Sequence, residues 1–172
     1  MEFLNGLKDR IPDYAKDIRL NLDAVIARSS LGEADALGTA LAAAYAARSK
    51  TIVDAIRGSG QLNETDTNAA LSAAALMGMN NVWYPYVEMA DDQDLKTQRP
   101  ELRMNAYATH GGVDKKRFEL FALAASIVGK CHFCVASHYK MLKENGLTAQ
   151  QLRDAGRIAA VVNAAAQAID AA

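Results

Sequence analysis

The residues of this chain with the clearest chemical potential lie in the stretch GKCHFCVASHYK, residues 129–140. It contains both cysteines of the chain, Cys131 and Cys134, and His138 follows the second by four residues. Residues three apart on a helix have Cα atoms about 5 Å apart, within the roughly 4.4–6.8 Å range of disulfides. The spacing therefore predicts a Cys-x-x-Cys pair on a helix that opens and closes a disulfide with little backbone motion.

His138 has the right spacing to exchange a proton with Cys134. Residues four apart lie on the same face of a helix, with Cα atoms about 6 Å apart, so the imidazole is expected to reach the thiol directly or through one water. An imidazole can take a thiol proton near neutral pH and return it later. If a new helix begins near Lys130, Cys131 lies in its first turn, where the helix dipole favours the thiolate.

Glu119 is the lone charged residue of the apolar run FELFALAASIVG. On one straight helix it would be about 18 Å from Cys131, too far to act. If the chain reverses near Gly129, Glu119 lies about 15 Å back along one helix and His138 about 12 Å forward along the next. In an antiparallel pair these similar distances place the two residues opposite each other. Two interpretations stay open: a surface position on an amphipathic helix, or a buried member of a proton relay.

Other interpretations of the cysteine segment also stay open. Both cysteines can be inert packing residues on an alanine-rich face. A zinc site made by Cys131, Cys134 and His138 is a third interpretation, although structural zinc normally has a second pair of ligands. Of the remaining histidines, His132 points away from the face shared by Cys134 and His138 and is expected at the surface, and His110 is expected in a loop.

The elements that must position these residues are all predicted to be helices. No segment combines sustained apolar/polar alternation with β-branched enrichment, so no strand is expected. Alanine-rich runs such as ALAAAYAA let helix axes approach to the short end of the roughly 8–10 Å range, which favours a compact helical bundle. Helices are predicted over residues 13–29, 32–49, 50–57, 63–89 and 115–128, then through the cysteine segment to 144, and from 148 onward.

Several helix ends carry recognisable signals. Residues 63–67 and Asp114 offer N-caps, and TAQQ at residues 148–151 fits a capping box. Pro12 is expected in the first turn of the helix through residues 13–29. Pro85 is expected to kink or end the long helix that contains it, and Met77, Met79, Trp83 and Tyr84 of that helix are expected in the core. The stretch DDQDLKTQRP, residues 91–100, is expected to be a polar connector.

A weak internal repeat relates the two halves of the chain. Setting Gly78 against Gly129 aligns LSAAALMGMNNVWY with ALAASIVGKCHFCV. The alignment predicts half-repeats at about 33–90 and 114–172 within one domain that spans residues 1–172. Chance similarity between alanine-rich helices is the alternative.

Composition limits the classes of function. A chain of 172 residues with 51% hydrophobic and 23% charged residues is typical of one globular domain with a substantial core. A net charge of −1 without a cluster of basic residues gives no indication of a nucleic acid or a membrane surface as partner. With neither a secretion signal nor a membrane span in view, we expect a cytoplasmic protein, where a close cysteine pair indicates catalysis or metal binding more than a structural bridge.

The combination of Glu119, Cys131-x-x-Cys134 and His138 resembles the pattern of the alkyl hydroperoxide reductase AhpD family. These are all-helical proteins related to carboxymuconolactone decarboxylases. The likeness extends along most of the chain, through IPDYAKDIRLNL at 11–22, MGMNNVWY at 77–84, RPELRMN at 99–105 and FELFALAASIVGKCHFCVASH at 118–138.

The resemblance implies an antioxidant, thiol-dependent peroxidase that acts on organic hydroperoxides and reduces an oxidised peroxiredoxin partner, alkyl hydroperoxide reductase C. Electrons would come from dihydrolipoyl groups on a lipoylated acyltransferase component, with no bound cofactor besides the redox-active disulfide. By position, Cys134 corresponds to the attacking cysteine and Cys131 to the resolving cysteine and proton donor. His138 and Glu119 correspond to the proton relay, and members are commonly homotrimers.

The chain departs from the family pattern at one position. The family has a histidine directly before the second cysteine, whereas this chain has Phe133 there and His132 one residue earlier. A shift of one residue turns a helical side chain by about 100°, so the resemblance assigns no role to either residue. Because a fold does not fix a function, two rivals remain: a decarboxylase acting on a lactone, and a non-enzymatic redox or metal-binding module.

Overall fold

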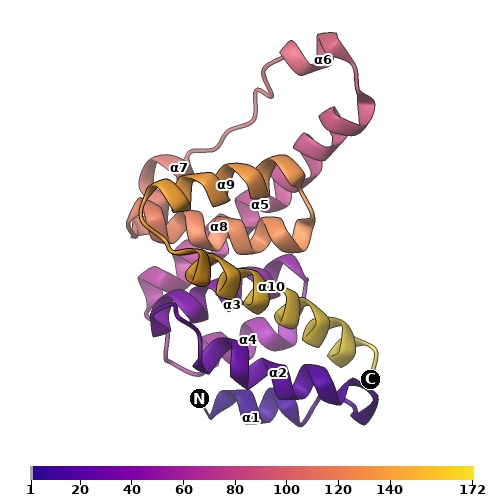
Figure 1. Ribbon diagram of the computed structural model, residues 1–172, viewed down its shortest axis with the longest axis vertical. Coiled ribbons are helices and arrows are strands. Elements are labelled where there is room, and N and C mark those ends of the chain that lie inside the picture. Colours follow the sequence, from indigo (N-terminus) through magenta and orange to yellow (C-terminus); the bar gives the residue numbers. More distant parts are fainter. Residues whose placement is uncertain (1) are drawn as a thin grey trace.

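The chain is all-α over residues 2–172, the part that the computed structural model describes (Figure 1). No strand occurs among these residues, as the sequence predicts. The α-helices are α1 (Phe3–Lys8), α2 (Lys16–Ala27), α3 (Glu33–Ala46), α4 (Lys50–Gly58), α5 (Glu64–Ala90), α6 (Gln93–Thr97), α7 (Ala106–Thr109), α8 (Lys115–Gly129), α9 (His132–Glu144) and α10 (Ala149–Asp170). Two short 3-10 helices, η1 (Asp13–Ala15) and η2 (His110–Gly112), complete the elements.

The core is made by α3, α5 and α8, which pack against one another, and by α10, which packs on α3 and α8; α9 covers α8 and α5 (Figure 1). Residues 42–44 of α3, all alanine, are fully buried. The backbone of α3 comes so close to α8 that a Cβ on Gly38 would lie 2.3 Å from the ring of Phe121. The small side chains therefore permit the close helix packing that the alanine-rich sequence predicts.

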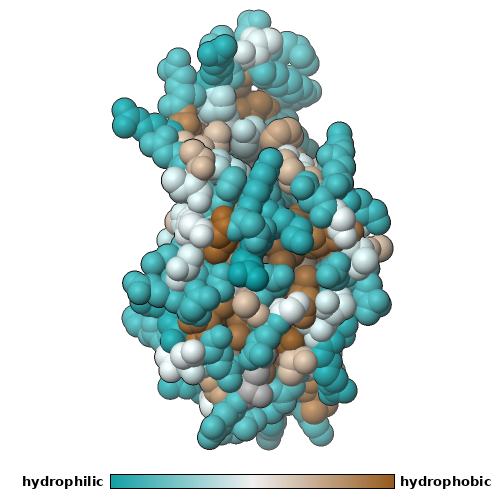
Figure 2. Space-filling model, turned by 90° about the vertical axis from the view of Figure 1, so that its left-hand side faces the viewer, coloured by the Kyte–Doolittle hydropathy of each residue, from teal (hydrophilic) through white to brown (hydrophobic). Residues whose placement is uncertain are grey.

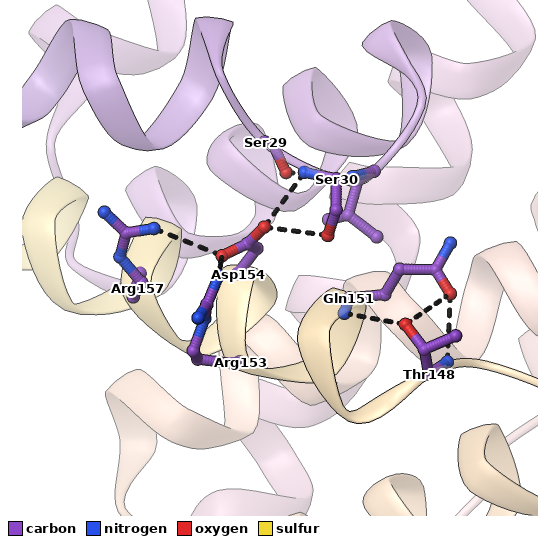
Figure 3. Close-up of polar contacts among 8 residues, drawn as sticks. Ser29, Ser30, Thr148, Gln151, Arg153, Asp154 and Arg157 are labelled. Atoms are coloured by element: carbon purple, nitrogen blue, oxygen red, sulfur yellow. Dashed lines mark hydrogen bonds and ion pairs between the residues drawn. The ribbon is translucent and has the colours of Figure 1, made fainter.

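The predicted cap residues occupy the helix ends. Asn63 and Asp114 cap α5 and α8, and each side chain accepts a hydrogen bond from the backbone N–H three residues further on. Thr148 and Gln151 form the full capping box at the start of α10 (Figure 3). These interactions are local in sequence, which is why the sequence alone identifies them.

Two proline positions differ in part from the prediction. The helix α5 does not end at Pro85 but continues to Ala90. Proline removes one hydrogen bond to a carbonyl one turn earlier, and here the helix is partly exposed, so water can satisfy that carbonyl. Pro12 precedes the 3-10 turn η1, so α2 begins at Lys16 rather than directly after the proline.

The end of α5 and the short helix α6 form an arm that projects from the body of the molecule (Figure 1). The connector predicted over residues 91–100 thus contains a helix, α6, whose N-cap Asp92 accepts a hydrogen bond from the N–H of Leu95. The arm exposes apolar side chains, including Tyr86 and Met89. It forms one side of a groove beside the cysteine segment.

Asp154 of α10 tethers the loop between α2 and α3 (Figure 3). Its buried carboxylate accepts hydrogen bonds from the N–H of Ser30 at 2.9 Å and from the Ser30 hydroxyl at 2.7 Å. Arg153 and Arg157 donate to its other oxygen. Burial raises the pKa of Asp154, but the hydrogen bonds from Ser30 and then from the two arginines outweigh burial and bring the pKa to about 2.

We expect Asp154→Asn to lower the free energy of unfolding by about 2 kcal/mol at pH 7, because the ionised carboxylate is favoured in the folded chain. The folded pKa lies below the ordinary aspartate pKa of 3.8, so this contribution is present above pH 4 and is lost as the pH falls towards 2. Urea denaturation of both proteins at pH 7 and at pH 3 measures it. A difference in stability that stays the same at both pH values would contradict the assignment.

The predicted half-repeats at 33–90 and 114–172 stay a prediction.

Among residues 2–172, no helix is both long and apolar enough to cross a membrane. Hydrophilic side chains cover most of the face seen in Figure 2, and hydrophobic ones show between them.

Candidate active site

The cysteine segment lies where α8 ends and α9 begins. Lys130 adopts a left-handed conformation with φ of 55° after the last residue of α8, and the chain then reverses into α9. Cys131 is the N-cap of α9, one residue before the helix, rather than part of its first turn. Its Sγ accepts a hydrogen bond from the backbone N–H of Cys134 at 3.2 Å. A sulfur therefore occupies the N-cap position, where a side chain accepts hydrogen bonds from the N–H groups of the helix start and where negative charge is favoured.

Cys131 and Cys134 form a disulfide, with Cα atoms 5.3 Å apart. This agrees with the separation of about 5 Å that helical spacing predicts. The two sulfurs differ in their surroundings: Cys131 is fully buried, whereas Cys134 borders a cavity of about 270 Å³. Of the pair, Cys134 is thus the one that a molecule in the cavity would meet.

A close approach of two helices fixes the turn before the cysteines. A Cβ on Gly129 would lie 2.1 Å from Nδ2 of Asn81 in α5. That amide group donates a hydrogen bond to the carbonyl of Ala125 in α8 at 3.1 Å. Only glycine leaves room for this contact, so α5 holds the end of α8 and with it the start of α9.

Glu119 and His138 lie face to face across the antiparallel pair α8 and α9. Oε2 of Glu119 is 2.6 Å from Nδ1 of His138, and both side chains are buried. The carboxylate accepts the hydrogen bond from Nδ1–H, which leaves Nε2 free to accept a proton. Of the two interpretations of Glu119, the buried position is the one found, and the chain reversal near Gly129 produces the pairing as expected.

Arg117 fixes the helix that carries Glu119. Its Nε is 2.7 Å from Oδ1 of Asp35 in α3, and its Nη1 is 2.8 Å from Oδ1 of Asp66 in α5. Burial lowers the pKa of Arg117, but the charges and hydrogen bonds of the two aspartates outweigh burial and raise it, so the guanidinium stays charged. These ion pairs hold α8 in register with α3 and α5. Arg117 lies two residues before Glu119, so they also fix the position of that carboxylate.

His138 and Cys134 border the same cavity, but the contacts of the imidazole are with Glu119 and Met77 rather than with the sulfur. Nε2 of His138 lies 3.2 Å from Sδ of Met77, and Sγ of Cys134 lies 3.8 Å from the carbonyl oxygen of Asn80. A proton passing between the two side chains therefore needs a turn of the imidazole or a water in the cavity. The second of these routes is the one-water path that the sequence allows.

The cavity has further walls that the sequence did not point to. Tyr107 of α7 borders it together with Glu119. Burial, then the charge of Glu119, then Tyr84 raise the pKa of Tyr107, so its phenol stays a neutral hydrogen-bond donor. Met104 also borders the cavity and lies 3.5 Å from Nδ2 of Asn80. No spacing pattern links α7 to the cysteine segment, so only the tertiary fold reveals these neighbours.

Aromatic residues near the site are less buried than the sequence suggested. Met77 is fully buried, as expected for a core residue. Met79, Trp83 and Tyr84, also expected in the core, are only half-buried. The reason is that they lie on the part of α5 that leads into the arm.

His132 and Phe133, between the two cysteines, point outward. His132 is exposed as expected, and its Nδ1 lies 3.2 Å from Oε1 of Glu88 on α5. Phe133 is 56% exposed and stacks on Tyr84, with ring centroids 4.4 Å apart. The remaining histidine, His110, is expected in a loop but instead lies at the start of the 3-10 helix η2, directly after α7.

Comparisons with known proteins find relatives along nearly the whole chain. The chain is 43% identical over 170 residues to the alkyl hydroperoxide reductase AhpD of Rhodospirillum centenum, covering 98% of this chain and 91% of the relative. It is 42% identical to the proteins of the same name from Rhodopseudomonas palustris strain BisA53 (96% and 92% covered) and Bradyrhizobium sp. strain BTAi1 (98% and 94% covered).

The family model of the carboxymuconolactone decarboxylase family matches residues 93–172, which include α8, α9 and the cysteine pair. The match to the curated relatives is broader, because it extends over nearly the whole of both chains. With this identity over this length, the chain belongs to the alkyl hydroperoxide reductase AhpD family.

Proposed function

We propose that this protein is an antioxidant thiol-dependent peroxidase and disulfide reductase that works through a Cys131–Cys134 dithiol/disulfide cycle. The observation that carries the proposal is the cavity in which Cys134 meets the buried pair of Glu119 and His138. The cavity brings a redox-active sulfur together with a base and the carboxylate that orients it. The relatives are named as alkyl hydroperoxide reductases, which supports the same class of reaction.

In the oxidative half of the cycle, His138 takes the proton of the Cys134 thiol, and Glu119 stabilises the imidazolium that forms. The thiolate attacks one peroxide oxygen and the O–O bond breaks. Cys134 becomes a sulfenic acid, and the leaving alkoxide takes the proton back from His138 and departs as an alcohol. Two electrons pass from sulfur to the peroxide in this step.

Cys131 then resolves the sulfenic acid. The Cys131 thiol gives up its proton and its sulfur attacks the sulfur of Cys134; the S–O bond breaks, and the hydroxide takes that proton and leaves as water. The disulfide that results is the state found in the structure. The hydrogen bond from the N–H of Cys134 to Sγ of Cys131 orients the resolving sulfur towards its partner.

In the reductive half, a dihydrolipoyl group on a lipoylated acyltransferase component supplies the electrons. One of its thiolates attacks the disulfide to form a mixed disulfide, and its second thiol closes the cyclic lipoyl disulfide and releases both cysteines reduced. In its disulfide-reductase role, the thiolate of Cys134 attacks the disulfide of an oxidised peroxiredoxin, alkyl hydroperoxide reductase C, and forms a mixed disulfide with it. Cys131 then attacks Cys134, which re-forms the Cys131–Cys134 disulfide and releases the peroxiredoxin reduced. We place the protein in the cytoplasm as a homotrimer of single-domain chains.

An NADH-oxidation assay with dihydrolipoamide dehydrogenase tests the proposal. Peroxide is supplied throughout, and the lipoylated carrier and the peroxiredoxin are added separately and together. Turnover with the carrier alone indicates a peroxidase, and turnover only with both indicates a peroxiredoxin reductase. No NADH oxidation under any combination would reject both roles.

A lactone decarboxylase is the second candidate, favoured by the family model that matches residues 93–172. The paired cysteines argue for redox chemistry, because decarboxylation does not require a disulfide. Lactone decarboxylation by protein with both cysteines alkylated separates the two candidates.

A metal-binding module is tested by metal analysis of the reduced protein. Reduction is needed because zinc binds thiolates, whereas both sulfurs form a disulfide in the structure.

A further inference from the structure

Two hollows of the molecule share one wall. The cavity of about 270 Å³ contains Cys134, and a groove of about 660 Å³ lies between α9 and the arm. Apolar side chains make up much of the groove, among them Trp83, Val87, Leu95 and Pro100. Tyr84 and Phe133 border both the cavity and the groove.

The shared wall is the stacked pair of Phe133 on α9 and Tyr84 on α5. The rings lie 4.4 Å apart with an interplanar angle of 27°. Phe133 is 56% exposed, so its side chain has room to leave the stack without disturbing the core. A stacked pair at the surface is a weak contact, and exposed side chains change rotamer within picoseconds to nanoseconds.

Contacts with α5 position the backbone beside this wall. His132 and Glu88 lie 3.2 Å apart at the groove and connect the start of α9 to α5. The contact between Gly129 and Asn81 fixes the turn just before. Movement of Phe133 can therefore be confined to its side chain, with the disulfide left in place.

The ring of Phe133 lines the cavity that contains the reactive sulfur. Cys134 is only 3% exposed, and the cavity beside it is small enough to suit hydrogen peroxide or a short alkyl hydroperoxide. The groove, on the other side of Phe133, has space for a larger molecule. Since the groove is largely apolar, it suits the hydrocarbon part of an organic hydroperoxide.

We propose that Phe133 is the residue that sets the size of hydroperoxide reaching Cys134. Stacked on Tyr84, it admits small peroxides to the cavity. A large organic hydroperoxide lies with its apolar part in the groove and reaches the sulfur only when Phe133 leaves the stack. This inference rests on the peroxidase function proposed for the same site.

The test compares Phe133→Ala with Tyr139→Ala, an exposed aromatic of the same helix that is outside the lining of both hollows. Reduced protein is mixed with hydrogen peroxide or with cumene hydroperoxide, and oxidation is followed by the fluorescence of Trp83, the one tryptophan of the chain. We expect Phe133→Ala to raise the ratio of the cumene hydroperoxide rate to the hydrogen peroxide rate about tenfold or more. Tyr139→Ala should leave that ratio near the wild-type value.

A second measurement does not depend on peroxidase activity. Reduced protein is alkylated with iodoacetamide or with a fluorescein maleimide, and labelling of Cys134 is followed by mass spectrometry. Phe133→Ala should favour the larger reagent in the same way. An unchanged or lower ratio for the larger reagent would overturn the proposal. If neither peroxide oxidises the wild-type protein, the proposed function fails, and the labelling ratio still decides the role of Phe133.

Discussion

Peroxide-dependent turnover of Cys134→Ser is expected to fall to the uncatalysed background. Cys134 borders the cavity, whereas Cys131 is buried behind it, so no second sulfur can take over the attack. A serine hydroxyl is a far weaker nucleophile near neutral pH than a thiolate. The measurement is NADH oxidation in the coupled assay with saturating lipoylated carrier.

Cys131→Ser is the matched control for this experiment, because it also removes the disulfide. It should still consume about one equivalent of peroxide per chain in a single burst, since the attacking sulfur remains while the resolving one is lost. A sulfenic acid trapped on Cys134 by dimedone would identify the product. If Cys134→Ser retained full turnover, or if the burst appeared in Cys134→Ser and not in Cys131→Ser, the assigned order of the two sulfurs would be wrong.

Glu119→Gln and His138→Gln are each expected to lower the turnover number by about 10²–10⁴-fold, the usual contribution of a general acid–base group. Glutamine at 119 retains the shape and can still accept the hydrogen bond from His138, but it lacks the charge that stabilises an imidazolium. Glutamine at 138 removes the base itself. The two side chains act as one unit, joined by a contact of 2.6 Å.

The double variant provides the sharper test of this unit. Because the partners are coupled, the loss in Glu119→Gln with His138→Gln should be close to that of the worse single variant rather than the product of both. Glu144→Gln, at an exposed position of α9 away from the cavity, is the matched control and should stay within about threefold of wild type. A loss under threefold in either Glu119→Gln or His138→Gln would remove that residue from the relay.

The sequence predicts those parts of the site whose geometry depends on residues close together along the chain. The Cys131–Cys134 separation follows from helical spacing, and the pairing of Glu119 with His138 follows from one reversal at Gly129. Cap residues such as Asp114 are equally local. In each case a few neighbouring residues determine the geometry, so a pattern in the sequence is sufficient.

The parts that could not be predicted depend on contacts between distant segments. Tyr107 reaches the cavity from a four-residue helix that has no periodic pattern of its own. Pro85 lies within a continuing helix because its surroundings are partly exposed, which propensity alone does not reveal. Phe133 interrupts the family pattern, and only its stacking on Tyr84 gives that change a physical meaning.

Cys131 both caps α9 and belongs to the redox-active pair, so the redox state of the protein affects the stability of α9. In the oxidised chain, Sγ of Cys131 is a weak, neutral acceptor for the N–H of Cys134. After reduction, once Cys131 has given up its proton, a thiolate at the same position would bear a full negative charge at the positive end of the helix dipole, which strengthens the cap. The stronger cap stabilises the dithiol form relative to the disulfide form. The disulfide is therefore a better oxidant and accepts electrons from a donor more readily.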